Sequence, residues 1–429
     1  MKNNYNLEIL NKIKEKKLSI GIIGLGYVGL KLLLQFANKK FEVYGFDNDL
    51  KKIKGLKKNK SPISYIKNKD INRVNKYTKY YSDNFTNTKN CDVIIICLPT
   101  PLNSKNKPDL SHIKNCMMYL QKHLRKGQSI ILESTTYPGT TEEIVASKLK
   151  KFKIGENFFV GYSPERENPG SKKFSFWNTP KIVSGYTKNC QKIVNNLYKK
   201  IVKKTIKSKK IEYAETAKIF ENVYRSVNIA LVNELKFILK KMKLDINHVI
   251  DLAKTKPFGF SEFRPGPGVG GHCIPIDPLY LSWAAKRKGY NTEFIELASK
   301  VNLDTTTKIF KELKKIIFKK KNKKVLIVGL SYKKNIEDTR ESAGVKFFTK
   351  LLKENIKVSF LDYLAHKIEL KGKIYKSIKL NYKNLSKFGV IIICSDHDFY
   401  NYEKIYKYSN LVVDLRNRYK FDDPKVIKI

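Results

Sequence analysis

Cysteines, long apolar runs and acidic residues are all scarce in this sequence. The 429 residues include six cysteines that lie far apart and form no CxxC pair, so their spacing suggests neither a disulfide framework nor a zinc site. No apolar run approaches the ~18 residues of a membrane-spanning helix. The opening residues, MKNNYNLEILNKIKEKK, contain no uninterrupted apolar stretch of signal-peptide length. We therefore expect a cytoplasmic protein with no membrane insertion and no bound metal.

The shortage of acidic residues gives the chain a strong positive charge. Its 39 Asp and Glu face 86 Lys and Arg, a formal net charge of +47. Such a balance is typical of nucleic-acid-binding proteins. The lysines are nevertheless spread along the whole chain, and its richness in Asn and Ile indicates compositional drift. We favour a solvated lysine surface that attracts anionic ligands, with no nucleic acid as partner.

The composition is that of a globular protein, with 41% hydrophobic and 12% aromatic residues over a length of two or three domains. Continuous apolar runs alternate with helical stretches in the first half. Such runs are typical of strands buried on both faces of a parallel sheet, so the alternation predicts a doubly wound α/β domain. The predicted strands are residues 18–24, 41–46, 92–98 and 129–132, and a helix is predicted over residues 30–36.

One long helix is predicted over residues 211–242. Apolar residues recur along it at helical spacing and form a stripe opposite a polar face. A helix about 45 Å long, at 1.5 Å per residue, is a natural spine between domains and a candidate dimer surface. The stripe consists of Phe220, Val223, Val227, Leu231, Leu235 and Ile238, and the polar face of Glu215, Lys218, Asn222, Arg225 and Asn233.

A second α/β set follows a Pro/Gly-rich segment (256–278) and a lysine-rich connector (314–324). Its first strand begins at residue 325, and VIIICSDH at 390–397 echoes VIIICLPT at 93–100. This half lacks a full GxGxxG, so we expect it to bind something other than a second dinucleotide. The predicted strands are residues 325–330, 358–361, 390–394 and 411–415. The predicted fold is α/β, with two Rossmann-like doubly wound domains joined by a long central helix, divided into residues 1–212, 213–310 and 311–429.

A glycine series follows the first apolar run directly. Gly24, Gly26 and Gly29 form GxGxxG, and Asp47 ends the next strand eighteen residues after Gly29. The glycines permit a tight turn and a close approach of the backbone to a pyrophosphate. Asp47 would accept hydrogen bonds from ribose hydroxyls and repel a 2′-phosphate. The series predicts an NAD site, and a glycine turn without a ligand is the alternative.

Cys273 has unusual neighbours. It lies in GVGGHCIPID, behind a glycine loop and four residues before Asp277. A nucleophilic thiol needs access and a lowered pKa, which such a loop and nearby cations can supply, although a lone cysteine is more often structural. On the long helix Lys218 and Asn222 are four positions apart and hence side by side. An exposed helix face is the alternative explanation of that pair.

Together these segments resemble the UDP-glucose/GDP-mannose dehydrogenase family of nucleotide-sugar 6-dehydrogenases along essentially the whole chain. Seven motifs occur in the family's order: GIIGLGYVGL, CLPTP, ESTTYPGT, YSPERENPG, AKIFENVYRSVNIALVNE, PGPGVGGHCIPIDPLYL and YKKNIEDTRES. SPERENPG and KPFGFSEFRPGPGVGGHCIPIDPLYLSW look most like the UDP-N-acetylglucosamine 6-dehydrogenase branch. The UDP-glucose enzymes usually have a Pro-Glu-Phe-Leu type segment in place of residues 164–167.

The resemblance implies a double oxidation of a sugar C6 alcohol to a carboxylate with reduction of two NAD+, in surface polysaccharide synthesis. The thiol of Cys273 would attack the intermediate aldehyde, and the thiohemiacetal would become a thioester that water hydrolyses. The active site would lie in the cleft between the two α/β domains, with a UDP-sugar as partner and a homodimer formed through the long helix.

The resemblance also assigns roles to particular residues. The catalytic roles fall to Cys273 as nucleophile, Lys218 and Asn222 as oxyanion stabilisers, Asp277 and Thr135 at the hydrolytic water, and Glu165 in proton transfer. The cofactor contacts are Gly24, Gly26, Tyr27, Val28, Gly29, Asp47, Thr100 and Arg340. The substrate contacts are Arg166, Arg264, Gly270, Lys333 and Lys334.

Two departures from the family pattern limit this transfer. Pro169 stands where the UDP-glucose type has a second acidic residue, so proton transfer rests on Glu165 or on Glu167. Lys31 stands where proline is common after GYVGL. The alternatives are a UDP-glucose or GDP-mannose 6-dehydrogenase, an idle NAD-binding scaffold and, from another class, a basic nucleic-acid-binding protein on a Rossmann scaffold.

Overall fold

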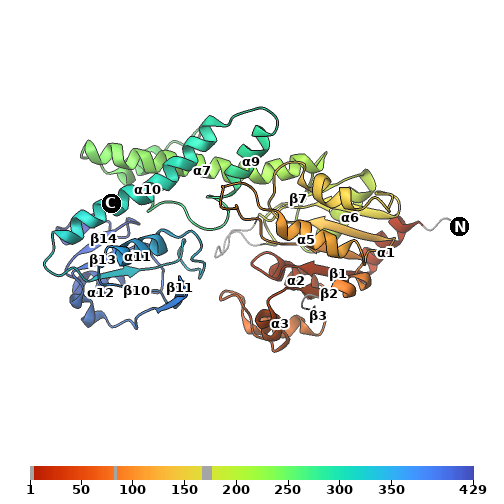
Figure 1. The fold of residues 1–429 in the computed structure, drawn as a ribbon, viewed down its shortest axis with the longest axis horizontal. Helices are drawn as coiled ribbons and strands as arrows, with labels where there is room; N and C mark the ends of the chain where they lie inside the picture. The colour runs from red at the N-terminus through yellow and green to blue at the C-terminus, as the bar shows by residue number, and fades with distance from the viewer. Residues whose placement is uncertain (1–3, 82–84, 167–175) are drawn as a thin grey trace. The chain divides into compact units, whose positions relative to one another are not determined.

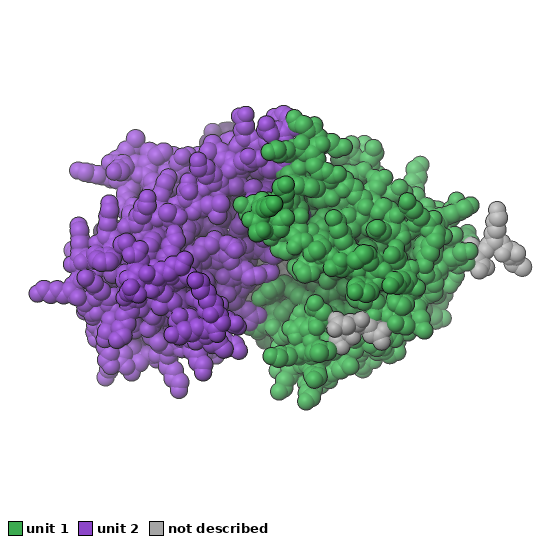
Figure 2. Space-filling model, in the orientation of Figure 1, with its two compact units in different colours: residues 1–221, 283–289 green, residues 222–282, 290–429 purple. Residues whose placement is uncertain are grey.

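The fold is that of a computed structural model, which describes residues 4–81, 85–166 and 176–429 (Figure 1). The chain divides into two compact units, residues 1–221 with 283–289 and residues 222–282 with 290–429, which Figure 2 distinguishes by colour. Two of the three unit boundaries fall inside helices α7 (Ile211–Lys241) and α9 (Asp277–Lys286), and the third follows α9. Each unit contains its own sheet of mostly or entirely parallel strands, which confirms the predicted fold class.

The first unit is built on an eight-stranded sheet in the order β3-β2-β1-β4-β5-β6-β7-β8. Neighbouring strands are parallel except for the antiparallel pair β6 and β7. The chain order reverses at β1, between β2 and β4, and ligands of such sheets bind at the carboxyl ends of the strands around this point. The strands are β1 (Ser19–Ile23), β2 (Glu42–Phe46), β3 (Thr78–Tyr81), β4 (Val93–Ile96), β5 (Gln128–Leu132), β6 (Phe158–Tyr162), β7 (Lys181–Gly185) and β8 (Thr205–Lys207).

Strands β1, β4, β5 and β6 are buried along their whole length, as their continuous apolar runs predict. Helix α2 begins at Gly29 and ends at Asn38, and seven of its ten residues are buried against the sheet. The other helical segments of this unit are α1 (Tyr5–Glu15), α3 (Leu50–Lys57), α4 (Asn68–Asn75), η1 (Phe85–Asn90), α5 (Ser111–Leu120), η2 (Thr141–Val145), η3 (Ala146–Lys148) and α6 (Lys188–Tyr198).

The second unit contains a five-stranded parallel sheet in the order β10-β9-β13-β14-β15 and a separate hairpin of β11 and β12. The strands are β9 (Val325–Val328), β10 (Val358–Leu361), β11 (Lys367–Leu370), β12 (Lys373–Lys376), β13 (Val390–Ile393), β14 (Val412–Asp414) and β15 (Val426–Lys428). The helical segments are α8 (Ile246–Ala253), α10 (Glu293–Phe318), α11 (Ala343–Lys353), η4 (Tyr382–Lys387) and α12 (Tyr402–Tyr408). No helix within the described ranges combines the length and apolar character that crossing a membrane requires.

The predicted lysine-rich connector at residues 314–324 is wrong in its first part. Helix α10 continues to Phe318, because Leu313 and Ile317 are fully buried in the core of the second unit. Their lysine neighbours point to solvent, so the charge of this segment marks the outer face of a helix. Only residues 319–324 connect α10 to β9.

Helix α7 is one continuous helix, in agreement with the sequence (Figure 1), but it buries several residues of the predicted polar face and exposes several of the predicted apolar stripe. Glu215, Asn222 and Asn233 of the predicted polar face are at most 2% exposed. By contrast, Phe220 is 63% exposed and Leu231 52% exposed. Polar groups are buried at low cost only when they are hydrogen-bonded, so the loops packed against α7 must supply partners.

In the second unit, these partners lie in the Pro/Gly-rich segment. The Gly266 N–H donates to Asn233 Oδ1 at 3.0 Å, and Lys236 Nζ donates to Gly266 O at 3.3 Å. Thr306 of α10 donates through Oγ1 to Pro267 O at 3.1 Å. The segment that leads to Cys273 is therefore held by buried polar side chains from two helices.

The centre of the second sheet repeats the centre of the first, with a different outcome. Gly329 follows β9 with φ +80°, as Gly24 follows β1 with φ +90°, and Asp362 follows β10 as Asp47 follows β2. The Asp362 carboxylate accepts hydrogen bonds from Leu330 N at 2.7 Å and Ala365 N at 2.8 Å.

His397 completes the partners of Asp362. Its Nδ1 accepts the Asn335 N–H, so the ring proton lies on Nε2 and is donated to Asp362 at 3.2 Å. Both side chains are fully buried. Asp362 occupies the position of the residue that would face a ribose in a dinucleotide site, but its carboxylate is already hydrogen-bonded within the second unit.

We expect replacement of Lys236 by Met to stabilise the protein at neutral pH. Burial lowers the pKa of Lys236 to about 7 from its ordinary 10.5. In the unfolded chain Lys236 stays protonated up to its ordinary pKa. Burying this charged group therefore lowers the free energy of unfolding most below pH 7, and the loss becomes smaller as the pH rises towards 10.5. Lys236→Met should gain about 1–3 kcal/mol below pH 7, measured by thermal melting against pH, and the gain should vanish at high pH.

Lys241→Met, an exposed lysine on the same helix, is the matched control and should leave the melting curve unchanged. A Lys236→Met protein that melts below wild type at every pH would contradict this prediction. It would show that the bond to Gly266 outweighs the cost of burying the ammonium.

Candidate functional site

The glycine series ends β1 as predicted, and its three members differ in what surrounds them. A Cβ on Gly24 would lie 2.6 Å from Cys97 O, and one on Gly29 would collide with Gly24 O. A Cβ on Gly26, by contrast, would meet nothing within 4 Å. Gly24 and Gly29 are thus required by the fold, whereas Gly26 leaves open the space that a pyrophosphate needs at the start of α2.

Asp47 lies at the carboxyl end of β2 with its side chain 6% exposed. Its Oδ2 accepts the Leu25 N–H at 2.8 Å and the Lys52 ammonium at 2.6 Å, and its Oδ1 accepts the Asp49 N–H at 2.9 Å. The carboxylate is thereby fixed against the glycine turn. Its remaining lone pairs can accept hydrogen bonds from ribose hydroxyls, so this acceptor fits NAD.

The other predicted cofactor residues of the first unit lie at the same edge of the sheet. Val28 directly precedes α2, and Tyr27 stacks on Tyr65 with ring centroids 6.0 Å apart. Thr100 is buried beyond the end of β4. The ammonium of Lys31 lies 4.5 Å from the Tyr65 ring centroid, so the departure from proline is accommodated by a cation–π contact.

The predicted proton-transfer residue Glu165 lies beside a buried ion pair that the sequence analysis missed. Lys181 Nζ is 2.6 Å from Glu133 Oε2 and 3.7 Å from Glu165 Oε2. Thr135, half-buried, follows β5 two residues after Glu133. One signal was present in the sequence: Lys181 opens the otherwise apolar run KIVSG, and a charged residue in a buried strand requires a partner.

Arg166 is held within the first unit. Its guanidinium donates to Pro180 O at 2.8 Å and forms an ion pair with Glu221 at 2.6 Å. Glu167 and Pro169, on which the alternative assignment of proton transfer depends, lie outside the described residues.

In the second unit, Cys273 is exposed and lies four residues before Asp277, the first residue of α9. All six cysteines lie within the described ranges, and Cys273 is the one that is exposed. The Asp277 N–H donates to Cys273 O at 2.8 Å, which places the thiol-bearing residue at the amino end of this helix. Asn222 Nδ2 donates to Asp277 Oδ2 at 2.5 Å, and both side chains are 2% exposed.

The Gly-rich loop before Cys273 packs on the loop that follows β9. The Gly271 N–H donates to Arg340 O at 2.9 Å. Side chains on Gly270 or Gly271 would collide with Tyr332, because a Cβ would lie 2.6 or 2.8 Å from its atoms. Two predicted segments, GVGGHC and YKKNIEDTRES, are therefore in direct contact within this unit.

The charges around this contact are mostly positive. Arg340 forms a bidentate pair with Asp338, with Nε–Oδ1 at 3.0 Å and NH2–Oδ2 at 2.6 Å. Burial, with Arg225 and Lys334 nearby, lowers the pKa of Lys333. Such a set favours an anionic ligand.

Two groups near these cations were missed in the sequence. Arg416 follows β14 and donates to Cys394 O at 2.6 Å and to Tyr332 O at 3.3 Å. His272 Nε2 is buried and has no hydrogen-bond partner in the described part of the chain. Burial, assisted by the charge of Arg340, lowers the pKa of His272. The arginine directly after an apolar strand was the available signal for Arg416.

Arg264 lies apart from these groups. Its Nε donates to Glu262 at 2.8 Å, its NH1 donates to Asn247 O at 3.0 Å, and it forms a short ion pair with Asp251. The guanidinium therefore has partners on α8 and in the loop that follows it. Its substrate role stays a prediction.

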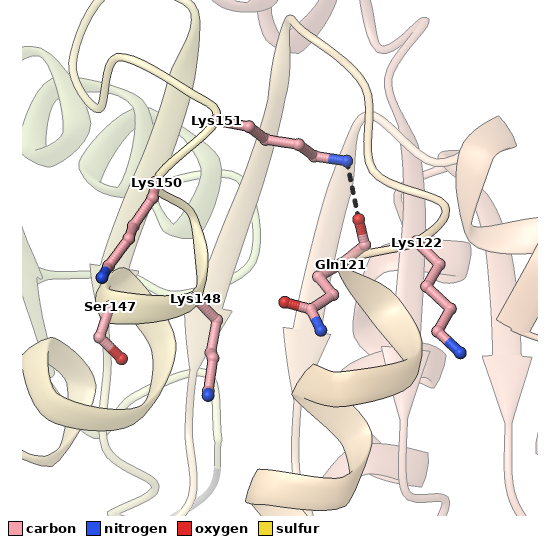
Figure 3. Close-up of a pocket in the computed structure, with 6 residues that line it drawn as sticks. All are labelled: Gln121, Lys122, Ser147, Lys148, Lys150 and Lys151. Carbon is pink, nitrogen blue, oxygen red and sulfur yellow. Dashed lines mark hydrogen bonds between the residues drawn. The ribbon is translucent and has the colours of Figure 1, made fainter.

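A lysine-lined hollow in the first unit belongs to the other edge of the sheet. Figure 3 shows it lined by Gln121, Lys122, Ser147, Lys148, Lys150 and Lys151, with the Lys151 ammonium bonded to Gln121 O at 2.8 Å. Helix α5 ends beside this hollow and leads into the amino end of β5. Ligands of such sheets bind at the carboxyl ends, so we assign no role to the hollow.

The glycine geometry predicts that two adjacent substitutions have different effects. Gly26→Ala should fold like wild type, within about 1 kcal/mol, while its affinity for NAD+ falls at least ~10-fold because the methyl group occupies the pyrophosphate space. Gly29→Ala should lose about 1–3 kcal/mol or more of stability, because its Cβ overlaps Gly24 O. Thermal melting and NAD+ titration separate the two, and wild-type NAD+ affinity in folded Gly26→Ala would refute the placement.

Three segments of the chain match the UDP-glucose/GDP-mannose dehydrogenase family. Residues 18–202 match its NAD binding domain, residues 212–304 its central domain and residues 326–421 its UDP binding domain. These ranges contain the glycine series, the Cys273 loop and the Lys333–Arg340 segment respectively.

Known relatives and a solved structure agree with these matches. The chain is 36% identical to protein CapL of Staphylococcus aureus over 405 residues, which covers 92% of this chain and 93% of CapL. It is 36% identical to UDP-N-acetyl-D-glucosamine 6-dehydrogenase of Pseudomonas aeruginosa over 355 residues, 81% of this chain and 83% of that protein. The structure of UDP-D-ManNAc dehydrogenase from Pyrococcus horikoshii superimposes with a TM-score of 0.83 at 28% identity, covering 96% of this chain and 99% of that one.

The family resemblance, the predicted fold and the NAD cofactor are thus confirmed. The glycine turn with its fixed Asp47 and the UDP binding domain occur together in one chain. We conclude that the chain belongs to the UDP-glucose/GDP-mannose dehydrogenase family and is an NAD-dependent nucleotide-sugar dehydrogenase.

Proposed function

We propose that this enzyme oxidises the C6 alcohol of a UDP-N-acetylhexosamine to the carboxylate. The substrate that we favour is UDP-GlcNAc. The observation that carries the proposal is the exposed Cys273 at the amino end of α9, with Asp277 one turn later bonded to Asn222. An accessible thiol allows a covalent acyl intermediate, and this intermediate distinguishes a double oxidation from the formation of an aldehyde alone.

The sulfur of Cys273 is the proposed nucleophile. In the first oxidation C6 loses a hydride and its hydroxyl loses a proton, which gives the aldehyde. The sulfur then adds to the carbonyl carbon, and the resulting thiohemiacetal loses a second hydride and proton to become a thioester. Water adds to the thioester, the thiolate leaves, and the carboxylate is released. NAD+ held at the glycine turn would accept one hydride in each oxidation, so two NAD+ would bind there in succession.

The chain's own polar groups divide the remaining work. Lys218 and Asn222, four positions apart on the continuous α7, are proposed to stabilise the developing alkoxide. Asp277, fixed by the Asn222 amide at 2.5 Å, and Thr135 are proposed to position the hydrolytic water. Glu165 takes part in proton transfer. Because the buried Asp277 carboxylate already holds the Asn222 amide in place, this donor needs no reorientation when the alkoxide forms, and it can stabilise the alkoxide more strongly.

The UDP moiety is assigned to the second unit. Lys333 and Lys334 would contact its phosphates, with Gly270 beside them, and Arg340 would reach the cofactor. The substrate roles of Arg166 and Arg264 stay predictions. We add Arg416 as a candidate phosphate contact, because its guanidinium bonds to Tyr332 O, next to Lys333.

The sequence motif SPERENPG, which begins at Ser163, and the relatives named UDP-N-acetyl-D-glucosamine 6-dehydrogenase favour the N-acetylhexosamine branch. Relatives named UDP-N-acetyl-D-mannosamine dehydrogenase are 30–32% identical, so the manno epimer is the nearest alternative. UDP-glucose and GDP-mannose remain the wider alternatives. A role in surface polysaccharide synthesis, which the family resemblance implies, belongs to the same proposal.

We also propose a homodimer through α7 and a cytoplasmic location. The exposed apolar residues of α7 recur near heptad spacing, at Tyr213, Phe220, Tyr224, Leu231 and Ile238, as an interhelical seam requires. NAD+ and UDP-sugars are cytoplasmic metabolites. The division into an NAD-binding part (1–212), a central part (213–310) and a UDP-sugar-binding part (311–429) belongs to the same proposal.

Replacement of Cys273 by Ser should abolish acid formation, with turnover at least ~100-fold below wild type, because an alkoxide leaves far less readily than a thiolate. Iodoacetamide should modify wild type at Cys273 before the other cysteines, and a UDP-sugar should protect it. Product analysis by mass spectrometry checks the first effect and peptide mapping the second. Wild-type acid formation by Cys273→Ser would refute the thioester route.

Lys218→Ala should lower kcat by about 100-fold while the Kd for NAD+ stays within about twofold, because the ammonium is proposed to act on the alkoxide and not on the cofactor. Steady-state kinetics with NAD+ titration checks the split. Lys241→Ala, an exposed lysine on the same helix, is the matched control. An unchanged kcat would show that Lys218 has no catalytic role and belongs to an ordinary helix face.

The substrate proposal is tested by kcat/KM for UDP-GlcNAc, UDP-ManNAc, UDP-GalNAc, UDP-glucose and GDP-mannose with excess NAD+. We expect UDP-GlcNAc to exceed UDP-glucose at least ~10-fold, because a pocket that hydrogen-bonds the acetamido group discriminates strongly against its absence. A preference for UDP-glucose would keep the chemistry and overturn the branch assignment. Turnover with none of them would favour an idle scaffold.

A further inference from the structure

The buried ammonium of Lys181 lies between two carboxylates at the carboxyl edge of the first sheet. It is 2.6 Å from Glu133 Oε2 and 3.7 Å from Glu165 Oε2. The side chains of Lys181 and Glu133 are 4% and 0% exposed, whereas that of Glu165 is 16% exposed. One cation thus joins a fully buried acid to the acid that the proposed mechanism uses.

The backbone explains why these three residues meet. Strands β6 and β7 are antiparallel, with Gly161 opposite Gly185 and Tyr162 opposite Ser184. The same register, continued by three residues, sets Glu165 opposite Lys181. Hydrogen bonds support this continuation, because Ser163 Oγ donates to Ile182 O at 2.7 Å.

The neighbouring strand supplies the other acid. Strand β5 runs parallel to β6 with Leu132 opposite Tyr162, and the Ser163 N–H donates to Leu132 O at 3.0 Å. Glu133, the residue after Leu132, therefore emerges beside Ser163. Three strand ends converge at the sheet edge where ligands of this fold bind.

The two carboxylates have different surroundings. Glu133 accepts the Lys181 ammonium on one oxygen and the Tyr198 hydroxyl on the other. Glu165 accepts the Arg166 N–H through Oε1 at 2.8 Å, and its Oε2 faces Lys181. Burial opposes the charged form of Lys181, but the carboxylates of Glu133 and Glu165 outweigh it, so the pKa of Lys181 is raised. The ammonium stays charged, and Glu133 anchors it.

We propose that Lys181, anchored by Glu133, is a positioning residue that fixes the carboxylate of Glu165 for proton transfer. Glu133 holds the ammonium in place, and the ammonium restricts the orientation of the Glu165 carboxylate at the edge of the sheet. This inference rests on the proposed function, because it presupposes that Glu165 transfers a proton. It adds Lys181 to the residues that act in proton transfer. In this inference Glu133 fixes the position of Lys181, and Lys181 fixes the position of Glu165.

The test compares variants that keep the buried charges balanced. Lys181→Met alone would leave Glu133 as an uncompensated buried carboxylate and risks unfolding. The double variant Glu133→Gln/Lys181→Met removes the pair together, and Glu133→Gln/Lys181→Gln is the second version in case the first does not fold. Tyr198→Phe is the matched control, because it removes the hydroxyl bond to Glu133 and keeps the ring that lies 5.3 Å from the Lys181 ammonium. Thermal melting establishes that each variant is folded.

We expect the folded double variant to lose at least tenfold in kcat with UDP-GlcNAc, or with the best substrate found, while both KM values stay within twofold. Glu133→Gln alone weakens the anchor but keeps Lys181 beside Glu165, so its loss in kcat should be smaller than that of the double variant. Tyr198→Phe should lose no more than about threefold. Adding Glu165→Gln to the double variant should cost less than a further twofold, because the residues act as one unit. A merely structural pair would give additive losses.

Two outcomes would overturn the inference: a folded double variant with wild-type kcat, or full additivity with Glu165→Gln. Glu165→Gln measured alone separates this inference from the function beneath it. If that variant loses kcat and the double variant does not, only the role of Lys181 fails. If Glu165→Gln has wild-type kcat, the proposed proton-transfer role fails, and the role of Lys181 fails with it.

Discussion

The buried polar side of α7 is the constraint on which much of the structure depends. Burying amides and carboxylates is costly unless each finds a hydrogen-bond partner, and the partners lie in loops and at the first residues of helical segments. Glu215 accepts the N–H groups of Gly139 and Thr141 in the first unit. Asn222 is bonded to Asp277 and Asn233 to Gly266 in the second unit. The helix therefore fixes segments that carry reactive or glycine-rich residues.

The same principle applies at the sheet edges. Asp47 and Asp362 occupy equivalent positions after the second strand of their sheets, and both accept an N–H from the turn after the first strand. The Asp47 carboxylate can still accept hydrogen bonds from a ligand, whereas the Asp362 carboxylate is occupied by His397 and by backbone N–H groups. One architecture thus yields a dinucleotide site in the first unit and a different kind of nucleotide site in the second. The ligand specificity of each sheet follows from which donors are already present.

Much of this could be predicted from the sequence, because local patterns determined it. The apolar runs at β1, β4 and β13, the span of α7 and the glycine turn all follow from periodicity and spacing. What could not be predicted depends on register and packing. Lys181 is sixteen residues from Glu165, and only the antiparallel register of β6 and β7 brings the two together. The burial of Asn222 and the exposure of Phe220 on one helix depend on what packs against it. The helical state of residues 314–318 depends on burial of Ile317, which lysine content conceals.

The central claim is a double oxidation at one carbon, and its most direct test is stoichiometry. Limiting UDP-GlcNAc with excess NAD+ should yield two NADH per sugar consumed, with a product whose C6 is a carboxylate and no free aldehyde accumulating. This ratio is required because the thiohemiacetal keeps the aldehyde bound to Cys273 until the second hydride is lost. One NADH per sugar with a released aldehyde would contradict it, and would leave the exposed thiol of Cys273 without the role assigned here.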